Sequence, residues 1–180
     1  MQVTLDPAQL EATRQALLGP QSQALIDLIF QLDLQLPLQG SHDEAFAEAI
    51  RLGWVDPQTR KLTALGWLVG DPIREYRFWL DRNRRVHGED YDLLKPERYA
   101  GLSVLEPGSG FGCNLLSLGR LPGRFVGVEP IALYRQFTPI FAQREGVPAP
   151  EVHDGSGESL PFADGEFDIV LCYSAHQYME

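Results

Sequence analysis

The sequence predicts an α/β fold in which a mostly helical region precedes a parallel sheet. Two observations predict the sheet. The apolar run 102–105 ends in Glu106 and a glycine-rich turn, and a second apolar run, 124–128, ends in Glu129. A third observation predicts the helices, because leucine and isoleucine recur at helical spacing through much of the chain before residue 86.

Composition narrows the function classes. The 180 residues are 44% hydrophobic, which is enough for a core, and carry a formal charge of −10. That charge argues against a nucleic-acid partner, because phosphate neutralisation dominates such binding. No run approaches the roughly 18 apolar residues of a membrane span, and no secretory leader follows Met1, so a cytoplasmic protein is expected. Two distant cysteines predict buried thiols in a reducing compartment, with no metal site.

The chain begins with two predicted helices, 6–18 and 22–31. The second is so apolar that it is expected to be buried almost all round, either in its own domain core or against a second subunit, which would make a homodimer. A break at Pro37 and Gly40 follows. The pattern Ser41-x-x-Glu44 is a capping-box signature and predicts a helix over 42–52.

Two short strand-like pieces around an Asp-Pro turn are predicted over 54–63, with Thr63 capping a short helix, 63–69. This order of helix, turn and helix resembles a winged-helix domain. DNA recognition is disfavoured because segment 41–51 carries three carboxylates against one arginine. A structural, dimerising or substrate-capping role is expected instead.

An amphipathic helix is predicted over 72–86. Its five arginines alternate with acids, which favours a solvated, salt-bridged face over an anion site. The polar stretch 87–100 reads as a linker. The expected domains are therefore 1–86, helical and winged-helix-like, and 101–180, the sheet.

The glycine-rich turn has an unusual register. Glu106 is followed at intervals of two by Gly108, Gly110 and Gly112, which lets backbone approach a ligand closely and permits positive φ angles. A dinucleotide-binding turn needs its third glycine at position 113, where this chain has cysteine. An NAD-dependent enzyme is therefore excluded.

Glu129 is expected to lie beside this turn. The 17 residues from Gly112 to Glu129 leave room for one helix, 111–119, and a turn at 121–123. A right-handed crossover makes the two strands parallel, so both carboxylates emerge at the same edge of the sheet. A carboxylate there can accept two hydrogen bonds from vicinal ribose hydroxyls and would repel a 2′-phosphate.

A third motif completes the pattern. Segment 158–162 reads Glu-Ser-Leu-Pro-Phe, and an Asp-Gly turn separates it from the strand-like run 167–173. The three motifs together, over 102–178, resemble the class I S-adenosylmethionine-dependent methyltransferases of the ubiquinone and menaquinone biosynthesis type. The resemblance implies a Rossmann-like sheet and S-adenosyl-L-methionine as cofactor.

The resemblance also implies roles for single residues. Glu106 would lie near the amino-acid end of the cofactor, the glycines would pass their backbone beneath it, and Glu129 would hold the ribose. The implied cofactor-binding residues are Glu106, Gly108, Ser109, Gly110, Gly112, Glu129, Pro130, Asp154, Ser156, Gly157, Glu158 and Tyr173. No metal ligand is implied.

Two assignments stay open within the resemblance. Family members usually place an aspartate against adenine where this chain has Ser156, while Asp154 stands two residues earlier; Asp154 is favoured. His176 could deprotonate an acceptor hydroxyl, although a packing or capping role is favoured. Tyr173 and Tyr178 are expected to form a pocket wall.

The implied activity is methyl transfer to an O, N or C atom of a small molecule. The alternative is a non-catalytic cofactor-binding regulator whose amino-terminal domain contacts a partner. The motifs supply the first four of the seven strands expected for the family. The sequence is therefore expected to be an amino-terminal portion of a longer protein, or to be completed by another chain, and the absent strands bear on whether the polypeptide alone turns over substrate.

Overall fold

The computed structural model describes residues 3–86 and 95–172, and they form two compact units. One unit is Leu5–Arg84, and the other contains Arg85–Glu180. No helix within these described ranges combines the length and the apolar character needed to cross a bilayer.

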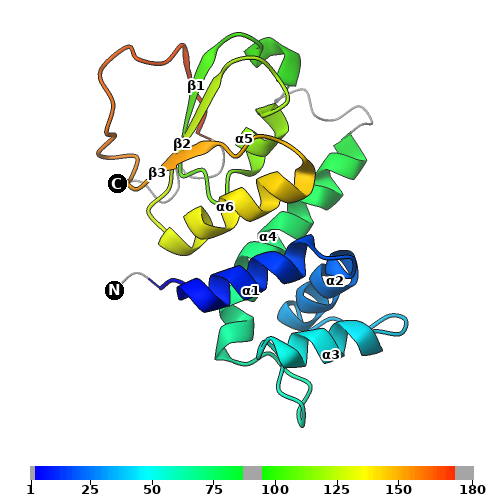
Figure 1. Cartoon of the computed structure of the whole chain (residues 1–180). Helices are drawn as coiled ribbons and strands as arrows, with labels where there is room; N and C mark the ends of the chain where they lie inside the picture. The colour runs from blue at the N-terminus through cyan, green and yellow to red at the C-terminus, as the bar shows by residue number, and fades with distance from the viewer. Residues whose placement is uncertain (1–2, 87–94, 173–180) are drawn as a thin grey trace. The chain divides into compact units, whose positions relative to one another are not determined.

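The first unit contains four helices, α1 Pro7–Leu18, α2 Ser22–Asp33, α3 Asp43–Arg51 and α4 Ala64–Val86 (Figure 1). The predictions of α1 and α2 are confirmed, and α2 buries most of its apolar side chains. A capping box begins α1: the Asp6 carboxylate accepts the Gln9 amide at 2.8 Å, and the Gln9 side chain accepts the Asp6 amide at 3.1 Å.

The predicted capping box of α3 is wrong. The helix begins at Asp43, so the N-cap is His42, which makes no side-chain cap bond. Ser41 donates instead to the Asp43 carboxylate at 3.3 Å, and Glu44 accepts from Gln21 at 2.7 Å. A start one residue later moves Glu44 out of the third helical position, from which a side chain can reach back to the cap.

The two predicted helices 63–69 and 72–86 are one continuous helix, α4. Thr63 caps it as predicted, accepting the Gly66 amide at 3.0 Å, but Pro72 lies inside the helix. An interior proline costs about 3 kcal/mol, whereas each large apolar side chain gains about 1.5–3 kcal/mol on burial. The fully buried side chains that flank Pro72 are Val69, Ile73 and Tyr76.

The segment between α3 and α4 is a tight turn with one antiparallel bridge, Val55 to Leu62, where two strand-like pieces were predicted. Asp56 organises the turn because its carboxylate accepts the amides of Gln58 and Thr59 at 3.0 and 2.7 Å. These bonds lower the pKa of Asp56. The assignment of this unit as a winged helix stays a prediction.

Two arginines of α4 form ion pairs with acids, as the sequence predicted. Arg77 contacts Asp27 at 2.8 Å, and Arg74 contacts Asp33 at 2.9 Å. The second pair differs from a solvated face because the Asp33 side chain is only 2% exposed. The other predicted arginines of this face have side chains outside the described set.

The second unit holds a four-stranded parallel sheet in the order β3-β2-β1-β4. This confirms the predicted α/β, Rossmann-like sheet. Figure 1 labels the first three strands, β1, β2 and β3. The residues of β3 are Glu-Val-His, which carry no strand signal of their own. The elements are η1 Pro96–Tyr99, β1 Ser103–Pro107, α5 Cys113–Leu118, β2 Arg124–Val128, α6 Ala132–Glu145, β3 Glu151–His153 and β4 Ile169–Val170.

Strand β4 has only two residues, and the side chain of Asp168 adds to the backbone bonds that join it to β1. The Asp168 carboxylate accepts the Ser103 amide at 2.8 Å and its hydroxyl at 2.6 Å, and the Leu171 amide bonds the Leu105 carbonyl at 2.7 Å. The hydrogen bonds from Ser103 lower the pKa of Asp168. Buried Leu105, Val126 and Val128 form the core beneath the strand ends.

Candidate functional site

The glycine turn and Glu129 meet where β1 and β2 end. Pro107 pairs with Val128, so both strands finish at the same level of the sheet. The Val128 carbonyl then accepts the amides of Gly108 at 2.7 Å and Ser109 at 3.2 Å. The turn after β1 is therefore tied to the last residue of β2.

The Glu129 carboxylate faces this turn. Its Oε2 accepts the Gly110 amide at 2.8 Å, and its Oε1 accepts the Ile131 amide at 2.8 Å. The residue is 4% exposed, and burial raises the pKa of its carboxyl, while the two backbone bonds and Arg135 act in the opposite direction. A carboxylate oxygen has two acceptor positions, so each can take a second donor.

Gly110 presents bare backbone beside that carboxylate. Its φ is 58°, and apart from its chain neighbours no atom of the described residues lies within 4 Å of where a Cβ would stand. Gly112, with φ 84°, is the N-cap of α5. The turn therefore leaves open space against its own backbone, as the glycine spacing predicted.

Glu106 is the most deeply buried carboxyl of the site, at 1% exposed. Its Oε1 accepts from the Asn114 side-chain amide at 2.5 Å, and its Oε2 is buried with no hydrogen-bond partner among the described residues. Burial raises the pKa of Glu106 to about 8; the Asn114 bond lowers it, and the Glu129 charge raises it. A cation near Oε2 would favour the ionised form.

Ser109 lies beneath the turn. A Cβ at Gly127 would stand 2.5 Å from its Oγ, so the serine packs on β2. The Oγ is buried and makes no hydrogen bond within the described part of the chain. Its contact with a cofactor stays a prediction.

The two candidates for the adenine contact, Asp154 and Ser156, differ in their exposure and in their contacts. The Asp154 side chain is 63% exposed and contacts Arg135 at 3.0 Å, and the same guanidinium nitrogen donates to the Glu129 carbonyl at 2.5 Å. Ser156 is half-buried, and its carbonyl accepts the Ser159 amide at 3.2 Å. Asp154 and Ser156 both stay predicted contacts of adenine.

The remaining predicted residues divide by position. Pro130 is exposed directly after Glu129, Gly157 is half-buried, and Glu158 is exposed in the loop after β3. Tyr173, Tyr178 and His176 lie outside the described residues, so their predicted roles stay predictions.

Two residues of the site escaped the sequence reasoning. Asn114 could have been found, because it is a polar side chain in the apolar helix α5, two positions after Gly112. Arg135 carries no comparable signal. It contacts both Glu129 and Asp154 only because α6 passes the ends of β2 and β3.

The segment that contains the candidate site is similar to known proteins. Residues 105–180 match the family described as methyltransferase domain. An uncharacterized methyltransferase, YcgJ of Bacillus subtilis, is 34% identical over 98 residues, which are 53% of this chain and 39% of that protein. A ubiquinone biosynthesis O-methyltransferase of Methylobacterium is 29% identical over 109 residues, 61% of this chain and 42% of the relative.

Two solved structures were also found. The crystal structure of YcgJ has a TM-score of 0.43 and 32% identity, covering 48% of this chain and 39% of its own. A SAM-dependent methyltransferase from Aquifex aeolicus has a TM-score of 0.41 and 20% identity, covering 51% and 56%. The chain spans about two-fifths of the length of the curated relatives that it matches. Over residues 105–180, the chain is therefore similar to the family described as methyltransferase domain.

Proposed function

We propose that this chain binds S-adenosylmethionine across the ends of β1 and β2 and takes part in transferring its methyl group to an O, N or C atom of a small molecule. One observation carries the proposal: the Glu129 carboxylate is bonded to the Gly110 amide at 2.8 Å, beside open space. An acid next to bare backbone suits a nucleoside whose ribose needs acceptors and whose chain needs close approach.

The residues present fit this cofactor in three respects. Glu129 has acceptor positions left for the two ribose hydroxyls, and its charge disfavours a 2′-phosphate. Gly110 leaves the room that a side chain would fill. The buried Oε2 of Glu106 lacks a donor within the described residues, and the cofactor's ammonium group can supply one.

The protein's share of the chemistry is positioning. When bound, the sulfonium supplies a reactive methyl group, and an enzyme gains rate by holding an acceptor in line with it. Glu106 and Glu129 would fix the two ends of the cofactor. Adenine would be held by Asp154, which must then share its carboxylate with Arg135, or by Ser156 and backbone.

The residues proposed to contact the methyl acceptor lie outside the described part of the chain. We include His176 as a candidate base for an acceptor hydroxyl, and Tyr173 as a cofactor contact. Support for the base comes from its residue type, because an unperturbed histidine has a pKa near 6.5 and exchanges protons at neutral pH.

Assembly and location are also proposals. A homodimer through the amino-terminal helices is proposed from the sequence alone, since α2 buries most of its apolar side chains within its own unit; light scattering of the purified chain tests it. A reducing, cytoplasmic location is supported by the cysteine content, because two cysteines far apart in the sequence are too few for a disulfide framework. The prediction that both thiols are buried is wrong, since Cys172 is exposed and Cys113 is half-buried. The charge of −10 supports a partner other than nucleic acid.

Isothermal titration of the full chain with S-adenosylhomocysteine tests cofactor binding. The wild-type chain is expected to bind, and Glu129→Gln to bind at least tenfold more weakly, because a hydrogen bond to a charged group contributes about 1.5–3 kcal/mol. Asp164→Asn is the matched control, since it removes one carboxylate from an exposed turn. Absence of binding to the folded wild-type chain would contradict the proposal.

Turnover is tested separately, by release of S-adenosylhomocysteine in the presence of candidate acceptors. Release above the rate without acceptor supports a transferase. Tight binding with no release, for a range of phenol, amine and carbon acceptors, would favour the regulator that binds its ligand without consuming it.

A further inference from the structure

Asn114 makes a contact that the cofactor site does not explain by itself. It lies in the first turn of α5, is 3% exposed, and its amide donates to Oε1 of Glu106 at 2.5 Å. Asparagine is a poor helix former, and its buried amide needs partners. The partner it has is the carboxyl predicted to meet the cofactor.

This bond makes the two oxygens of Glu106 unequal. Oε1 is held by Asn114, whereas Oε2 is buried without a donor among the described residues. A buried acceptor left unpaired is unfavourable, and native structures have few of them. A carboxyl fixed at one oxygen and unpaired at the other is arranged for an external donor.

We propose that Asn114 is a positioning residue, which holds the Glu106 carboxyl by Oε1 so that Oε2 can accept the ammonium group of the methyl donor. The inference rests on the proposed function, because the donor is that cofactor. Asn114 itself acts only through Glu106.

The charge state of Glu106 provides a readout of this role. An ammonium group prefers the ionised carboxyl, and the Asn114 bond lowers the pKa that burial has raised to about 8. The charge of Glu129 also raises the pKa of Glu106. The two carboxylate oxygens of Glu129 are themselves bonded to backbone amides. Titratable side chains on the neighbouring elements include Arg124 on β2 and Glu129 after it, Arg135 on α6, Cys113 on α5, Tyr99 of η1, and Asp168 and Cys172 beside β4.

The experiment follows affinity for S-adenosylhomocysteine from about pH 6 to 10 by titration calorimetry on the full chain. For the wild type, affinity is expected to rise with pH through the titration of Glu106. For Asn114→Leu, we expect at least a tenfold loss at pH 7 and a midpoint about one pH unit higher, with the two curves converging at high pH. Asn114→Asp keeps the shape of the side chain and is expected to raise the midpoint further, since two carboxyls then share a proton.

Thr138→Val is the matched control. Thr138 is 2% exposed, and its hydroxyl bonds the Tyr134 carbonyl at 3.2 Å, so the change removes a buried polar group from the same unit without touching Glu106. Its pH midpoint is expected to match the wild type. In a Glu106→Gln background, Asn114→Leu is expected to leave the pH profile unchanged.

An equal loss of affinity at every pH, or an unmoved midpoint in both Asn114 variants, would overturn the proposal and leave cofactor binding intact. If the wild type binds nothing, the proposed function fails instead. The carboxyl carbon of Glu106, followed by NMR in the ligand-free chain, still reports on the positioning. Its midpoint must rise in a folded Asn114 variant, and a constant value contradicts the inference.

Discussion

Oε2 of Glu129 accepts a hydrogen bond from the backbone amide of Gly110, nineteen positions earlier in the chain. The bond joins the first residue after β2 to the middle of the turn after β1. It exists because the crossover through α5 brings both strand ends to one edge of the sheet. The Glu129 carboxylate and the bare backbone of Gly110 therefore lie side by side at this edge of the sheet.

Gly110→Ala is expected to abolish cofactor binding and to lower stability only by the strain of its backbone conformation. An alanine at φ 58° is strained by about 1–2 kcal/mol, and its methyl group would enter the open space. Gly146→Ala is the matched control, because Gly146 has φ 66° and a Cβ there also meets nothing within 4 Å. Urea unfolding should show similar losses for both variants, and calorimetry should show lost binding for Gly110→Ala alone. Equal binding by the two would contradict the prediction.

Gly127→Ala is expected to destabilise the sheet by about 1–3 kcal/mol, as overpacking does in tight cores. The added methyl group would lie 2.5 Å from Ser109 Oγ and 2.9 Å from Leu115 Cδ1. Thermal unfolding measures the loss. The double variant with Ser109→Gly should recover part of it, because only the clash with Leu115 remains. No recovery would show that the serine is not the obstacle.

Glu106 is expected to make stability fall as pH rises. Its pKa is about 8 in the folded protein against an ordinary 4.5, so between these values the folded state holds a proton that the unfolded state has lost. The stabilisation is complete below about pH 4.5 and decreases by about 1.4 kcal/mol per pH unit until about pH 8. Urea unfolding at pH 5, 7 and 9 measures this slope.

Glu106→Gln is the comparison for that slope. It keeps an acceptor for Asn114 but cannot ionise, so its unfolding free energy should depend less on pH and exceed that of the wild type above pH 8. Burial also raises the pKa of Glu129, which leaves a weaker slope of the same sign in the variant. Parallel slopes in the two proteins would exclude a buried, protonated Glu106.

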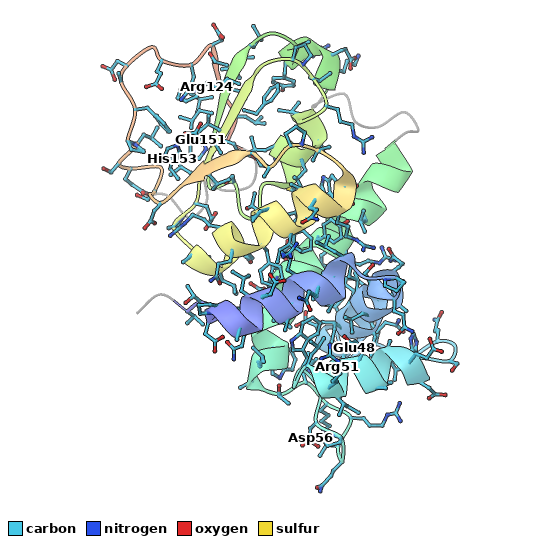
Figure 2. The ribbon with its side chains drawn as sticks, viewed as in Figure 1. Glu48, Arg51, Asp56, Arg124, Glu151 and His153 are labelled. Atoms are coloured by element: carbon cyan, nitrogen blue, oxygen red, sulfur yellow. The ribbon has the colours of Figure 1, made fainter. Side chains whose placement is uncertain are left out.

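The two kinds of ion pair in the helical unit should respond differently to loss of their acids. Asp33→Asn removes the buried carboxylate that pairs with Arg74, which keeps Asp71 and Glu75 as partners, and is expected to destabilise by about 1–3 kcal/mol. Glu48→Gln removes the partner of Arg51, whose side chain is 65% exposed, and is expected to change stability by less than about 0.5 kcal/mol (Figure 2). Chemical unfolding measures the stability loss of each variant. Similar losses in the two variants would refute the distinction between the buried and the exposed ion pair.

Sequence reasoning placed Glu129 beside the glycine turn because strong rules apply there. The glycine spacing and the handedness of the crossover together placed Glu129 against Gly110, without knowledge of side-chain packing. The bond between Asn114 and Glu106 was missed because it depends on how α5 is rotated against β1. Arg135 was missed because its two contacts come from the path of α6 past two strand ends.

Helix ends were harder to predict. The capping box at Ser41 and Glu44 fits the sequence pattern, but α3 begins one residue later and uses the Glu44 side chain elsewhere. Pro72 predicted a helix start, yet tertiary packing of the residues around it keeps α4 continuous. Local propensities differ by amounts that burial of one apolar side chain can exceed.

A crystal structure of the full chain with S-adenosylhomocysteine tests the central claim most directly. The account predicts both ribose hydroxyls within hydrogen-bond distance of the Glu129 carboxylate and the ligand lying against the bare backbone of Gly110. A nucleoside bound elsewhere, or a Glu129 side chain turned away from the ligand, would contradict it.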